Sequence, residues 1–550
     1  MARRQPYTLA VVVPSGRDVS GRVRYTHWTY RQLDRDSDEI ARGLRAIGIA
    51  RGSRAVVMVR PGLDFFSLVF AVFKAGIVPV LIDPGIGLRN LGQCCREAAP
   101  EVFIGIPKAL WAHRILGWGR ETVRRRILVA PGHNWSSSRG TPTLDQVRRI
   151  GREPPDQALE VQHSADPFPG DAMAAILFTS GSTGPPKGAV YTHDILNAQV
   201  DLIRDLFAIE PGEIDLCTFP LFALFAPALG MTAIVPDMDP TRPALADPAK
   251  LVETIKDFGV TNLFGSPALL RQLGRGDPRS PTRLPTLKRV VSAGAPLSAV
   301  ILERMAGRLA APAEVYPTYG ATEALPVASI GSVEVLGRAR PATDAGAGVC
   351  VGRPVDGIDV RIIRISDDPI ATWSDDLAVP EGTIGEIVVS GPVVTREYFN
   401  RPEATRLAKI VDPERAIQYH RMGDVGYRDD QGKLWFCGRK SHRVILHDQT
   451  LFTIPCEAIF NTHPAVFRSA LVGVKRGGET IPVICIEPIR RLARSERDRV
   501  CGELLERAAA FAQTRRIRTI LFHRAFPVDI RHNSKIFREQ LAAWAARRLS

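Results

Sequence analysis

The sequence has no long uninterrupted apolar run, no paired-cysteine motif and no dense basic block. Its longest apolar stretch, residues 65–82, is interrupted by Lys74, Gly76 and Pro79, so no transmembrane segment is predicted. The apolar run near the N-terminus is too short for a secretory signal peptide. None of the eight cysteines forms a C-x-x-C pair, and no histidine spacing suggests zinc. We therefore expect a cytoplasmic protein with reduced thiols.

The net charge of +14 is not gathered into a nucleic-acid-binding surface. Arginines are spread along the chain and mixed with acidic residues, without the aromatic interleaving of single-strand binders. We expect no nucleic-acid partner; an anionic small molecule, an acidic partner protein or simple arginine-rich codon usage accounts for the charge equally well. A hydrophobic content of 45% and a charged content of 24% are typical of an ordinary globular protein.

Alternating helix and strand patterns predict an α/β fold with mainly parallel, helix-covered sheets. The first half alternates helical spacing at 29–47 and 64–75 with short apolar strands at 55–59 and 78–82. Residues 119–170 are polar and predict connecting loops. From residue 382 short strands and turns predict a small β subdomain, and after residue 439 the pattern becomes α+β. We expect a large domain over 1–438 and a small, mobile domain over 439–550.

A loop of small and hydroxyl residues follows the apolar run 173–178. Glycines let the backbone turn tightly so that its N–H groups point at one centre, which suits a polyphosphate. Hydroxyl groups add donors and a lysine adds positive charge. It is not the P-loop of the common NTPases, which ends in Gly-Lys-Ser/Thr. A solvated surface loop is the alternative. The candidate binding residues are Thr179, Ser180, Gly181, Ser182, Thr183, Gly184 and Lys187.

The order Thr-Ser-Gly-Ser-Thr-Gly-x-Pro-Lys-Gly resembles the signature of the adenylate-forming superfamily of acyl-CoA synthetases, luciferases and peptide-synthetase adenylation domains. Later segments resemble further motifs of that family, in the family's order: residues 292–297, 316–323, 419–424 and 533–536. The resemblance runs over nearly the whole chain. It implies an AMP-binding large domain, a small C-terminal domain that carries a catalytic lysine, and ATP and Mg²⁺ as cofactors.

The resemblance also implies roles for individual residues. Thr322 would donate to the α-phosphate, Glu323 would hold Mg²⁺, and Lys535 would stabilise charge on the α-phosphate as pyrophosphate leaves. Asp424 would accept hydrogen bonds from the ribose hydroxyls, with Arg439 as a second ribose or phosphate contact. The alternatives are a plain strand-to-helix turn at residues 292–297, a surface position for Glu323 and a solvated side chain for Lys535. The residues implied to flank adenine are Ala293, Gly294, Ala295, Pro296, Thr318, Tyr319 and Gly320.

Three positions depart from the pattern of acyl-CoA synthetases. Ala223 stands where the motif Pro-Leu-Phe-His has its histidine, the hinge reads Arg-Lys-Ser-His at 439–442, and Thr450 replaces a glycine near the expected pantetheine path. All three concern the second half-reaction and the domain rotation that serves it. They leave adenylation intact and put thioester formation in doubt.

Residues 324–355, the string WFCGRKSHRV and the string HNSKI resemble the OleC-type olefin β-lactone synthetases, a branch of this superfamily. That resemblance implies activation of a long-chain 2-alkyl-3-hydroxyalkanoic acid as acyl-AMP, followed by attack of its own β-hydroxyl to close a β-lactone. It also implies work beside other olefin-pathway enzymes in a multi-enzyme assembly. A long-chain fatty acid–CoA ligase is the second hypothesis, and a nucleotide-binding sensor without turnover is the third. His193 and His442 are candidate proton acceptors, with a structural role as the alternative.

Overall fold

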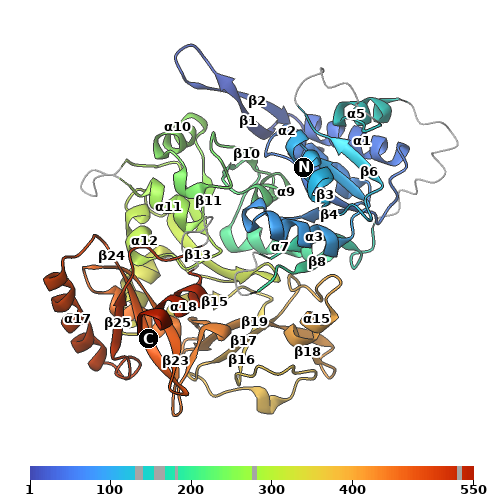
Figure 1. Ribbon diagram of the computed structural model, residues 1–550. Helices are drawn as coiled ribbons and strands as arrows, with labels where there is room; N and C mark the ends of the chain where they lie inside the picture. Colours follow the sequence, from blue (N-terminus) through green and yellow to red (C-terminus); the bar gives the residue numbers. More distant parts are fainter. Residues whose placement is uncertain (131–139, 154–167, 180–183, 276–281, 529–535, 550) are drawn as a thin grey trace.

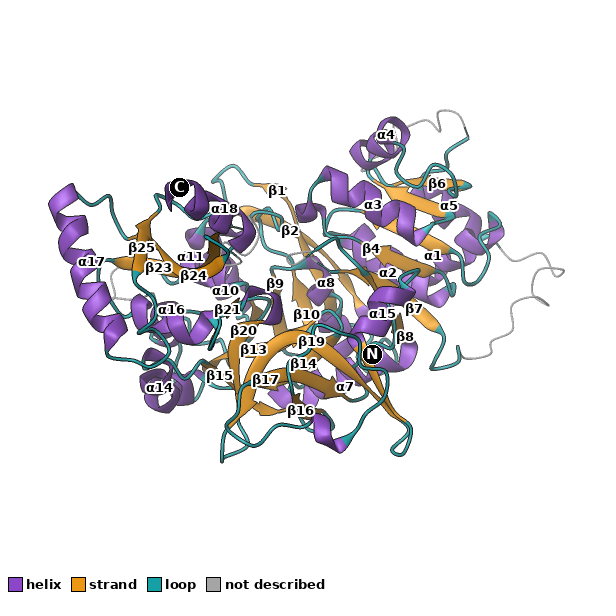
Figure 2. Ribbon diagram, turned by 60° about the horizontal axis from the view of Figure 1, so that its bottom comes forward, coloured by secondary structure: helices purple, strands orange, loops and turns teal. Residues whose placement is uncertain are grey.

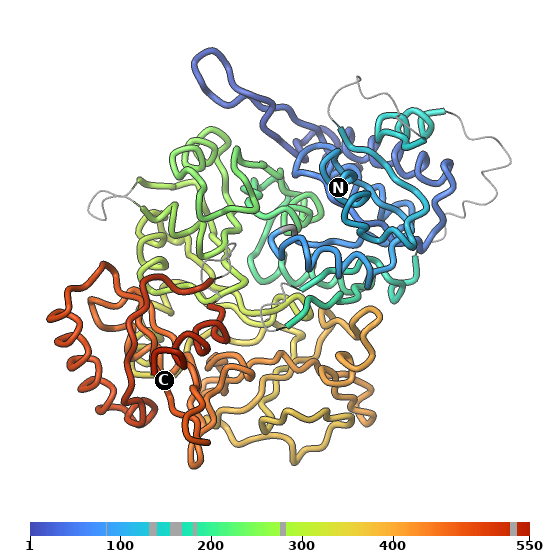
Figure 3. The backbone as a smooth tube through the Cα atoms, viewed as in Figure 1, coloured from blue at the N-terminus to red at the C-terminus, as the bar shows by residue number. Residues whose placement is uncertain are grey.

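The computed structural model describes residues 1–130, 140–153, 168–179, 184–275, 282–528 and 536–549 (Figure 1). It is an α/β fold, as the sequence predicts, with two large sheets and two small ones in the described residues. The chain begins in the upper right of the view, crosses the green middle region and ends in the red C-terminal part, as the backbone trace also shows (Figure 3).

A six-stranded sheet carries the strand that leads into the predicted phosphate loop. Its order is β6-β5-β3-β4-β7-β8, and every pairing is parallel except that of β8 with β7. The strands are β3 (Arg54–Met58), β4 (Val78–Leu81), β5 (Val102–Gly105), β6 (Arg125–Leu128), β7 (Met173–Phe178) and β8 (Gly188–Thr192). The nearby helices are α1 (Tyr30–Ala46), α2 (Leu63–Lys74), α3 (Leu88–Ala98) and α4 (Pro107–Leu116).

The expected helix at 29–47 and the expected strands at 55–59 and 78–82 are confirmed within one or two residues. α1 begins directly after Thr29, whose hydroxyl accepts the N–H of Gln32 in a capping box. Its apolar stripe, which includes Ile40 and Leu44, is fully buried against the sheet and α2. Burial of that stripe, at about 25 cal/mol per Å² of apolar surface, is what fixes the helix to the sheet.

A fourteen-stranded sheet forms the centre of the molecule (Figure 2). From β1 through β10, β9, β11 and β12 to β13 its pairings are parallel, and beyond β13 they are antiparallel. Its first strands are β1 (Leu9–Arg17), β2 (Val23–Thr29), β9 (Ile214–Cys217), β10 (Thr232–Ile234), β11 (Asn262–Phe264), β12 (Arg289–Ser292), β13 (Glu314–Ala321) and β14 (Ala324–Ser329). Helices α7 (His193–Phe207), α8 (Pro220–Ala223), α9 (Phe225–Leu229), α10 (Pro248–Phe258), α11 (Pro267–Leu273) and α12 (Ala299–Ala306) accompany them.

The antiparallel end of this sheet contains the β-rich part that the sequence predicts from residue 382, but it begins earlier, at Val349. It consists of β15 (Val349–Pro354), β16 (Asp359–Ile363), β17 (Gly385–Ser390), β18 (Lys409–Asp412), β19 (Ile417–Arg428) and β20 (Leu434–Arg439), with α15 (Pro402–Ala408) beside it. Short helical segments α13 (Ser332–Glu334) and α14 (Arg340–Asp344) precede β15. The parallel and antiparallel parts therefore meet at the β13–β14 hairpin, which makes that hairpin a natural place for a site.

The C-terminal part has its own sheets and core. β21 (Val444–Ile445) pairs with β22 (Thr450–Leu451), and a second sheet joins β23 (Val466–Arg476), β24 (Glu479–Pro488) and β25 (Thr519–Phe522). Helices α16 (Thr453–Asn461), α17 (Arg494–Ala509) and α18 (Arg538–Leu549) pack around them. β20 is the last strand along the chain that belongs to the large sheet, and it ends at Arg439. We therefore propose the domain boundary at residues 438–439.

The prediction that residues 119–170 are only connecting loops is wrong. β6 adds an edge strand to the six-stranded sheet, and α5 (Leu144–Arg152) packs against α1. Thr143 caps α5 through a capping box with Gln146, and Arg148 reaches Asp36 of α1 at 3.0 Å. A nine-residue helix with few apolar residues has a weak periodic signal, so its cap and its arginine contacts decide its place.

The sequence predicts no transmembrane segment and predicts reduced cysteines. Among the helices of the part that the structure covers, none combines the length and the apolar character that a membrane crossing requires. All eight cysteines are described, and each is a free thiol. Burial raises the pKa of Cys94 and Cys95 to about 12, so these thiols are protonated and unreactive at neutral pH.

Candidate active site

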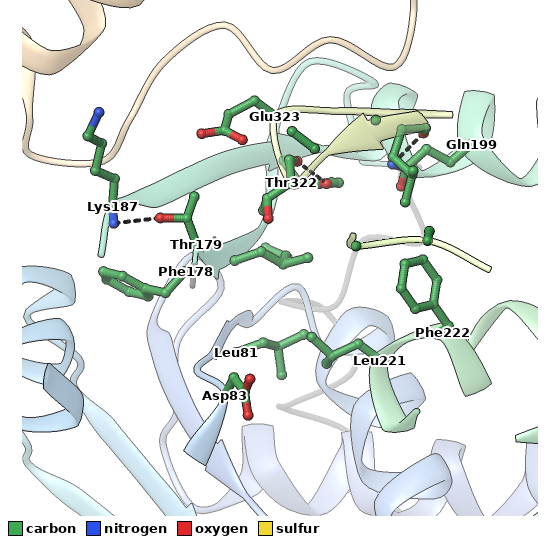
Figure 4. A pocket seen from close by; sticks show the side chains of 18 of the residues that line it. Leu81, Asp83, Phe178, Thr179, Lys187, Gln199, Leu221, Phe222, Thr322 and Glu323 are labelled. Atoms are coloured by element: carbon green, nitrogen blue, oxygen red, sulfur yellow. Dashed lines mark hydrogen bonds between the residues drawn. The ribbon is translucent and has the colours of Figure 1, made fainter. Parts of the chain in front are cut away.

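One large cavity lies where the two large sheets meet, and it has a volume of about 700 Å³. Figure 4 shows Thr179 and Lys187 on one side of it, Thr322 and Glu323 above it, and Leu221 and Phe222 on the opposite side. One end is therefore polar and charged, whereas the other is lined by apolar and aromatic side chains. A cavity of this size and character is typical of a small-molecule site.

The two ends of the predicted phosphate loop are held together at the polar side. The Thr179 N–H donates to the Lys187 carbonyl at 2.9 Å, and the Lys187 N–H donates to Thr179 Oγ1 at 3.1 Å. These bonds close the loop at the point where β7 turns back into β8. Thr179, Gly184 and Lys187 line the cavity. The predicted binding residues Ser180, Gly181, Ser182 and Thr183 lie outside the described residues.

Thr322 and Glu323 form the two-residue tip of the β13–β14 hairpin, because Ala321 pairs with Ala324. Each is held from outside the hairpin: the Tyr191 hydroxyl donates to the Thr322 carbonyl at 2.5 Å, and the Thr395 N–H donates to the Glu323 carbonyl at 2.9 Å. Both tip residues line the cavity. The structure thus brings two of the predicted catalytic residues to the predicted phosphate-loop lysine and threonine.

A segment that the sequence did not single out connects these two groups. We call residues 393–399 the strap. Its Tyr398 hydroxyl donates to Glu323 Oε1 at 2.5 Å, and the Lys187 ammonium lies 4.9 Å from the centre of the Tyr398 ring. The Phe399 N–H donates to the Gly188 carbonyl at 2.8 Å, which ties the strap to β8. One tyrosine therefore orients both the carboxylate and the lysine of the site.

Lys409, at the start of β18, supports the strap from behind. Its side chain is buried, and its Nζ donates to the Thr395 carbonyl. Burial lowers the pKa of Lys409 to about 7, against its ordinary 10.5. A lysine at this place therefore loses its proton near neutral pH while it still donates to the strap.

Replacing Lys409 by methionine is expected to raise the melting temperature most at about pH 6 and progressively less toward pH 10. The pKa of Lys409 is lower in the folded protein than in the unfolded chain. Between about pH 7 and 10.5 the side chain is therefore neutral in the folded protein and protonated in the unfolded chain. Wild-type stability therefore rises with pH from about 7 to 10.5, and below that window the buried charge destabilises the fold. Thermal unfolding of both proteins across this range checks the prediction. Replacement of the exposed Lys475 by methionine is the control. A change in melting temperature for Lys409→Met that is the same at every pH would contradict the prediction.

The buried Asp424 and the half-buried Arg439 form an ion pair at the β19–β20 hairpin. Arg439 Nη1 lies 3.1 Å from Asp424 Oδ1, and the Tyr319 hydroxyl donates to Asp424 Oδ2 at 2.7 Å. The carboxylate raises the pKa of Arg439, while burial and the same carboxylate raise the pKa of Tyr319 well above its ordinary value. The three predicted residues are thus brought together, and Arg439 also lines the cavity.

The predicted adenine-side residues fall into two groups. Ala293, Gly294 and Gly320 line the cavity, and Gly294 has a φ of +91°, a conformation that favours glycine where the chain leaves β12. Ala295 and Pro296 continue from Gly294 without lining the described cavity. Thr318 contacts Ser329 at 3.2 Å between hydroxyl oxygens and faces a smaller neighbouring cavity.

The hinge segment is anchored by its own lysine. Lys440 Nζ lies 3.1 Å from a carboxylate oxygen of Glu386 and donates to the Ser366 carbonyl at 2.7 Å. Glu386 is fully buried and is also paired with Arg421 at 2.7 Å. The departure at 439–442 therefore places a cation, not a carboxylate, next to Arg439. Thr450 lies in β22 and Ala223 is buried in α8, so neither is a free side chain in the cavity.

The candidate histidines differ in position. His193 lines the cavity and stacks on Phe168 at 5.2 Å, and burial lowers its pKa. His442 lies 3.5 Å from Glu539, and burial with Arg538 lowers its pKa to about 4. His420, which the sequence did not single out, also lines the cavity, and burial with Lys409 keeps its pKa well below 6.5. Neutral imidazoles are thus available in the cavity wall.

The donor set fits a magnesium ion that is shared with phosphates. In the described part of the chain, no group of three or more histidine, cysteine or acidic side chains is arranged to hold a metal alone. Glu323 offers one carboxylate, which the Tyr398 hydroxyl orients. Mg²⁺ commonly binds through one carboxylate, substrate phosphates and water, and Glu323 suits that mode. The predicted catalytic Lys535 lies outside the described residues; Ile536, which follows it, pairs with Val528.

Comparisons with known proteins concern the sequence and the fold of the chain. Residues 2–399 match the family model described as AMP-binding enzyme. The chain is 48% identical to the olefin beta-lactone synthetase of Xanthomonas campestris, covering 99% of this chain and 96% of the relative. It is also 48% identical to the olefin beta-lactone synthetase of Stenotrophomonas maltophilia, covering 100% and 97%.

Among solved structures, the fold matches o-succinylbenzoate coenzyme A synthetase from Bacillus subtilis, determined in complex with ATP and a magnesium ion. The TM-score is 0.73 at 19% identity, over 98% of both chains. At that identity the match concerns the fold alone.

Proposed function

The chain belongs to the AMP-binding enzyme family, an AMP-forming ligase family that uses ATP, and on that premise we propose that it converts a β-hydroxy acid into a β-lactone. The observation that carries this proposal is the 48% identity, over the full length, to enzymes named olefin beta-lactone synthetase. The cavity supports it, because a polar end that suits a triphosphate adjoins an apolar end that suits alkyl chains. The substrate class we propose is a long-chain 2-alkyl-3-hydroxyalkanoic acid.

In the first step, a carboxylate oxygen of the acid attacks the α-phosphorus of ATP, and the bond to the β-phosphate breaks to release pyrophosphate. We propose that the loop between Thr179 and Lys187 holds the phosphates and that Thr322 donates to the α-phosphate. Asp424 and Arg439 would bind the ribose, since an ionised carboxylate can accept from two hydroxyls. Lys535 would stabilise the charge that develops on the α-phosphate.

We propose that Glu323 holds Mg²⁺ through its carboxylate, and that the ion supplies charge neutralisation for the phosphates when it is bound. Tyr398 keeps that carboxylate in place, and the strap keeps the hairpin tip in place. The chain's own contribution is therefore a carboxylate that is already oriented before the nucleotide arrives. That arrangement avoids reorganisation at the moment of reaction.

In the second step, the β-hydroxyl oxygen attacks the acyl carbon, and the bond from that carbon to the AMP oxygen breaks. AMP leaves, the hydroxyl proton is lost, and a four-membered ring closes. Both reacting groups belong to one molecule, so orientation replaces the recruitment of a second substrate. Thr450, Ala223 and the Lys440 hinge support this proposal, because each departs from the sequence pattern of enzymes that pass the acyl group to CoA.

Replacing Tyr398 by phenylalanine is expected to raise about tenfold the Mg²⁺ concentration that ATP binding requires. The ring that underlies Lys187 stays, but the hydrogen bond to the Glu323 carboxylate is lost. ATP affinity measured calorimetrically over a Mg²⁺ series checks this without turnover. Tyr427 replaced by phenylalanine is the matched control, because that ring stacks on Trp435 away from the cavity. Equal Mg²⁺ dependence in wild type and variant would remove Tyr398 from this role.

The deciding experiment supplies the purified protein with ATP, Mg²⁺ and a long-chain β-hydroxy acid, with and without CoA. We expect a β-lactone, AMP and pyrophosphate in equal amounts, at a rate that CoA does not change. Acyl-CoA as the product, with no lactone, would favour the long-chain fatty acid–CoA ligase. ATP binding with no turnover of any acid would favour a nucleotide sensor. We also propose that the enzyme works in the cytoplasm beside other olefin-pathway enzymes.

A further inference from the structure

A second, smaller cavity of about 80 Å³ lies behind the aromatic wall of the main cavity. The two cavities share five lining residues: Phe222, Phe225, Phe264, Ala293 and Leu325. Because the same side chains line both spaces, only their thickness separates the two. Figure 4 shows the Phe222 ring at the edge of the main cavity.

The wall between the cavities is a cluster of packed rings. The Phe222 ring centre lies 4.3 Å from that of Phe264 and 6.2 Å from that of Phe225. All three rings are half-buried, so their exposed faces border open space. Phe222 lies on α8, a helix of only four residues that begins at Pro220. Phe222 itself therefore belongs neither to a long helix nor to a sheet strand.

The interior of the small cavity is apolar. Most of its remaining lining is aliphatic or aromatic: Ile203, Phe207, Ile209, Leu229, Met231 and Val291. Asp215, Asn262 and Thr318 also border it. Asn262 Nδ2 donates to the Asp215 carboxylate, the Cys217 thiol lies 3.1 Å from the same carboxylate, and the Thr318 hydroxyl lies 3.2 Å from that of Ser329. These polar groups contact each other or a neighbouring hydroxyl, and Asn262 Oδ1 is left without a hydrogen-bond partner among the described residues. A cavity whose lining is mostly apolar accepts hydrocarbon.

We propose that the small cavity is the far end of an alkyl-chain subsite, and that Phe222 limits how much of the chain reaches it. This inference rests on the proposed function, because it takes an acid with long apolar chains as substrate. The cavity holds roughly three methylene-sized groups, if each takes the ~30 Å³ that a water molecule takes in the liquid. The ligand class is the terminal methylene and methyl groups of one chain of the acid.

The test measures kcat/KM for acyl-AMP formation over a graded series of straight-chain β-hydroxy acids. Phe222→Ala joins the two cavities, so we expect preference for the longer acid to rise about fourfold for each of roughly three added methylenes. Ile203, on α7, borders the small cavity but not the main one, so Ile203→Phe fills the small cavity alone. Added to Phe222→Ala, it should cancel the gain.

A gain that persists in the double variant would place the added methylenes elsewhere and overturn the assignment, as would an unchanged chain-length profile in Phe222→Ala. If Phe222→Ala does not fold, as judged by thermal unfolding, Phe222→Leu opens the wall partially and should shift the profile in the same direction by a smaller amount. Failure of the proposed function is distinguishable, because the wild type would then form no β-lactone from any acid in the series, whatever the chain-length profile of acyl-AMP formation.

Discussion

Replacing Lys535 by alanine is expected to lower the rate of acyl-AMP formation by about 10²- to 10³-fold while ATP affinity changes little. The side chain is proposed to act where charge develops on the α-phosphate, which is a contribution to the transition state more than to ground-state binding. We propose that phosphate binding in the ground state rests on the loop whose two ends Thr179 and Lys187 hold together. The pyrophosphate release rate and the calorimetric Kd for ATP, measured on the same preparation, separate the two effects.

The exposed Lys475 replaced by alanine is the matched control for that experiment, because it removes the same side chain from β23 of the C-terminal part. Its rate and its Kd should equal those of the wild type. A Lys535→Ala enzyme with an undiminished rate of pyrophosphate release would remove Lys535 from the mechanism. A large loss of ATP affinity would instead make it a nucleotide-binding residue.

Replacing Asp424 by asparagine is expected to weaken ATP binding by about 10- to 100-fold and to lower the melting temperature. Asparagine keeps the shape of the side chain but loses the charge that faces Arg439 at 3.1 Å. The half-buried guanidinium then has no counter-charge at that position, which destabilises the hairpin. The Tyr319 hydroxyl, at 2.7 Å, also loses a charged acceptor. Calorimetric titration with ATP and thermal unfolding measure the two consequences.

Asp430, exposed at the turn of the same β19–β20 hairpin, provides the control when replaced by asparagine. It changes the net charge by the same amount, and we expect unchanged ATP affinity and stability. If Asp424→Asn bound ATP as tightly as this control does, Asp424 would have no part in ribose recognition.

Motifs made of consecutive residues were the part of the site that the sequence could predict. Residues 316–323 and 419–424 fold as strand and hairpin segments. Residues that are close in each string therefore stay close in the structure, which places Tyr319, Glu323 and Asp424. The alternation of helices and strands likewise predicted the α/β fold, since periodicity reports which face of each element is buried.

What the sequence did not predict depends on contacts between distant segments. Tyr398 meets Glu323 across 75 residues, and Lys409 reaches Thr395 only because β18 pairs with β19 behind the strap. A lone tyrosine or lysine in a polar stretch has no periodic or motif signal that would reveal such a role. α5 was missed for a related reason, because its Arg148 contacts with α1 come from 112 residues away.

The measurement that tests the central claim most directly follows oxygen atoms through a single turnover. The acid is labelled with ¹⁸O at the β-hydroxyl in one experiment and at both carboxylate oxygens in another, and CoA is left out. The account predicts that the hydroxyl label is retained in the lactone ring, and that one carboxylate label appears in AMP while the other stays in the lactone carbonyl. AMP without carboxylate label, or a product that has lost the hydroxyl oxygen, would contradict it.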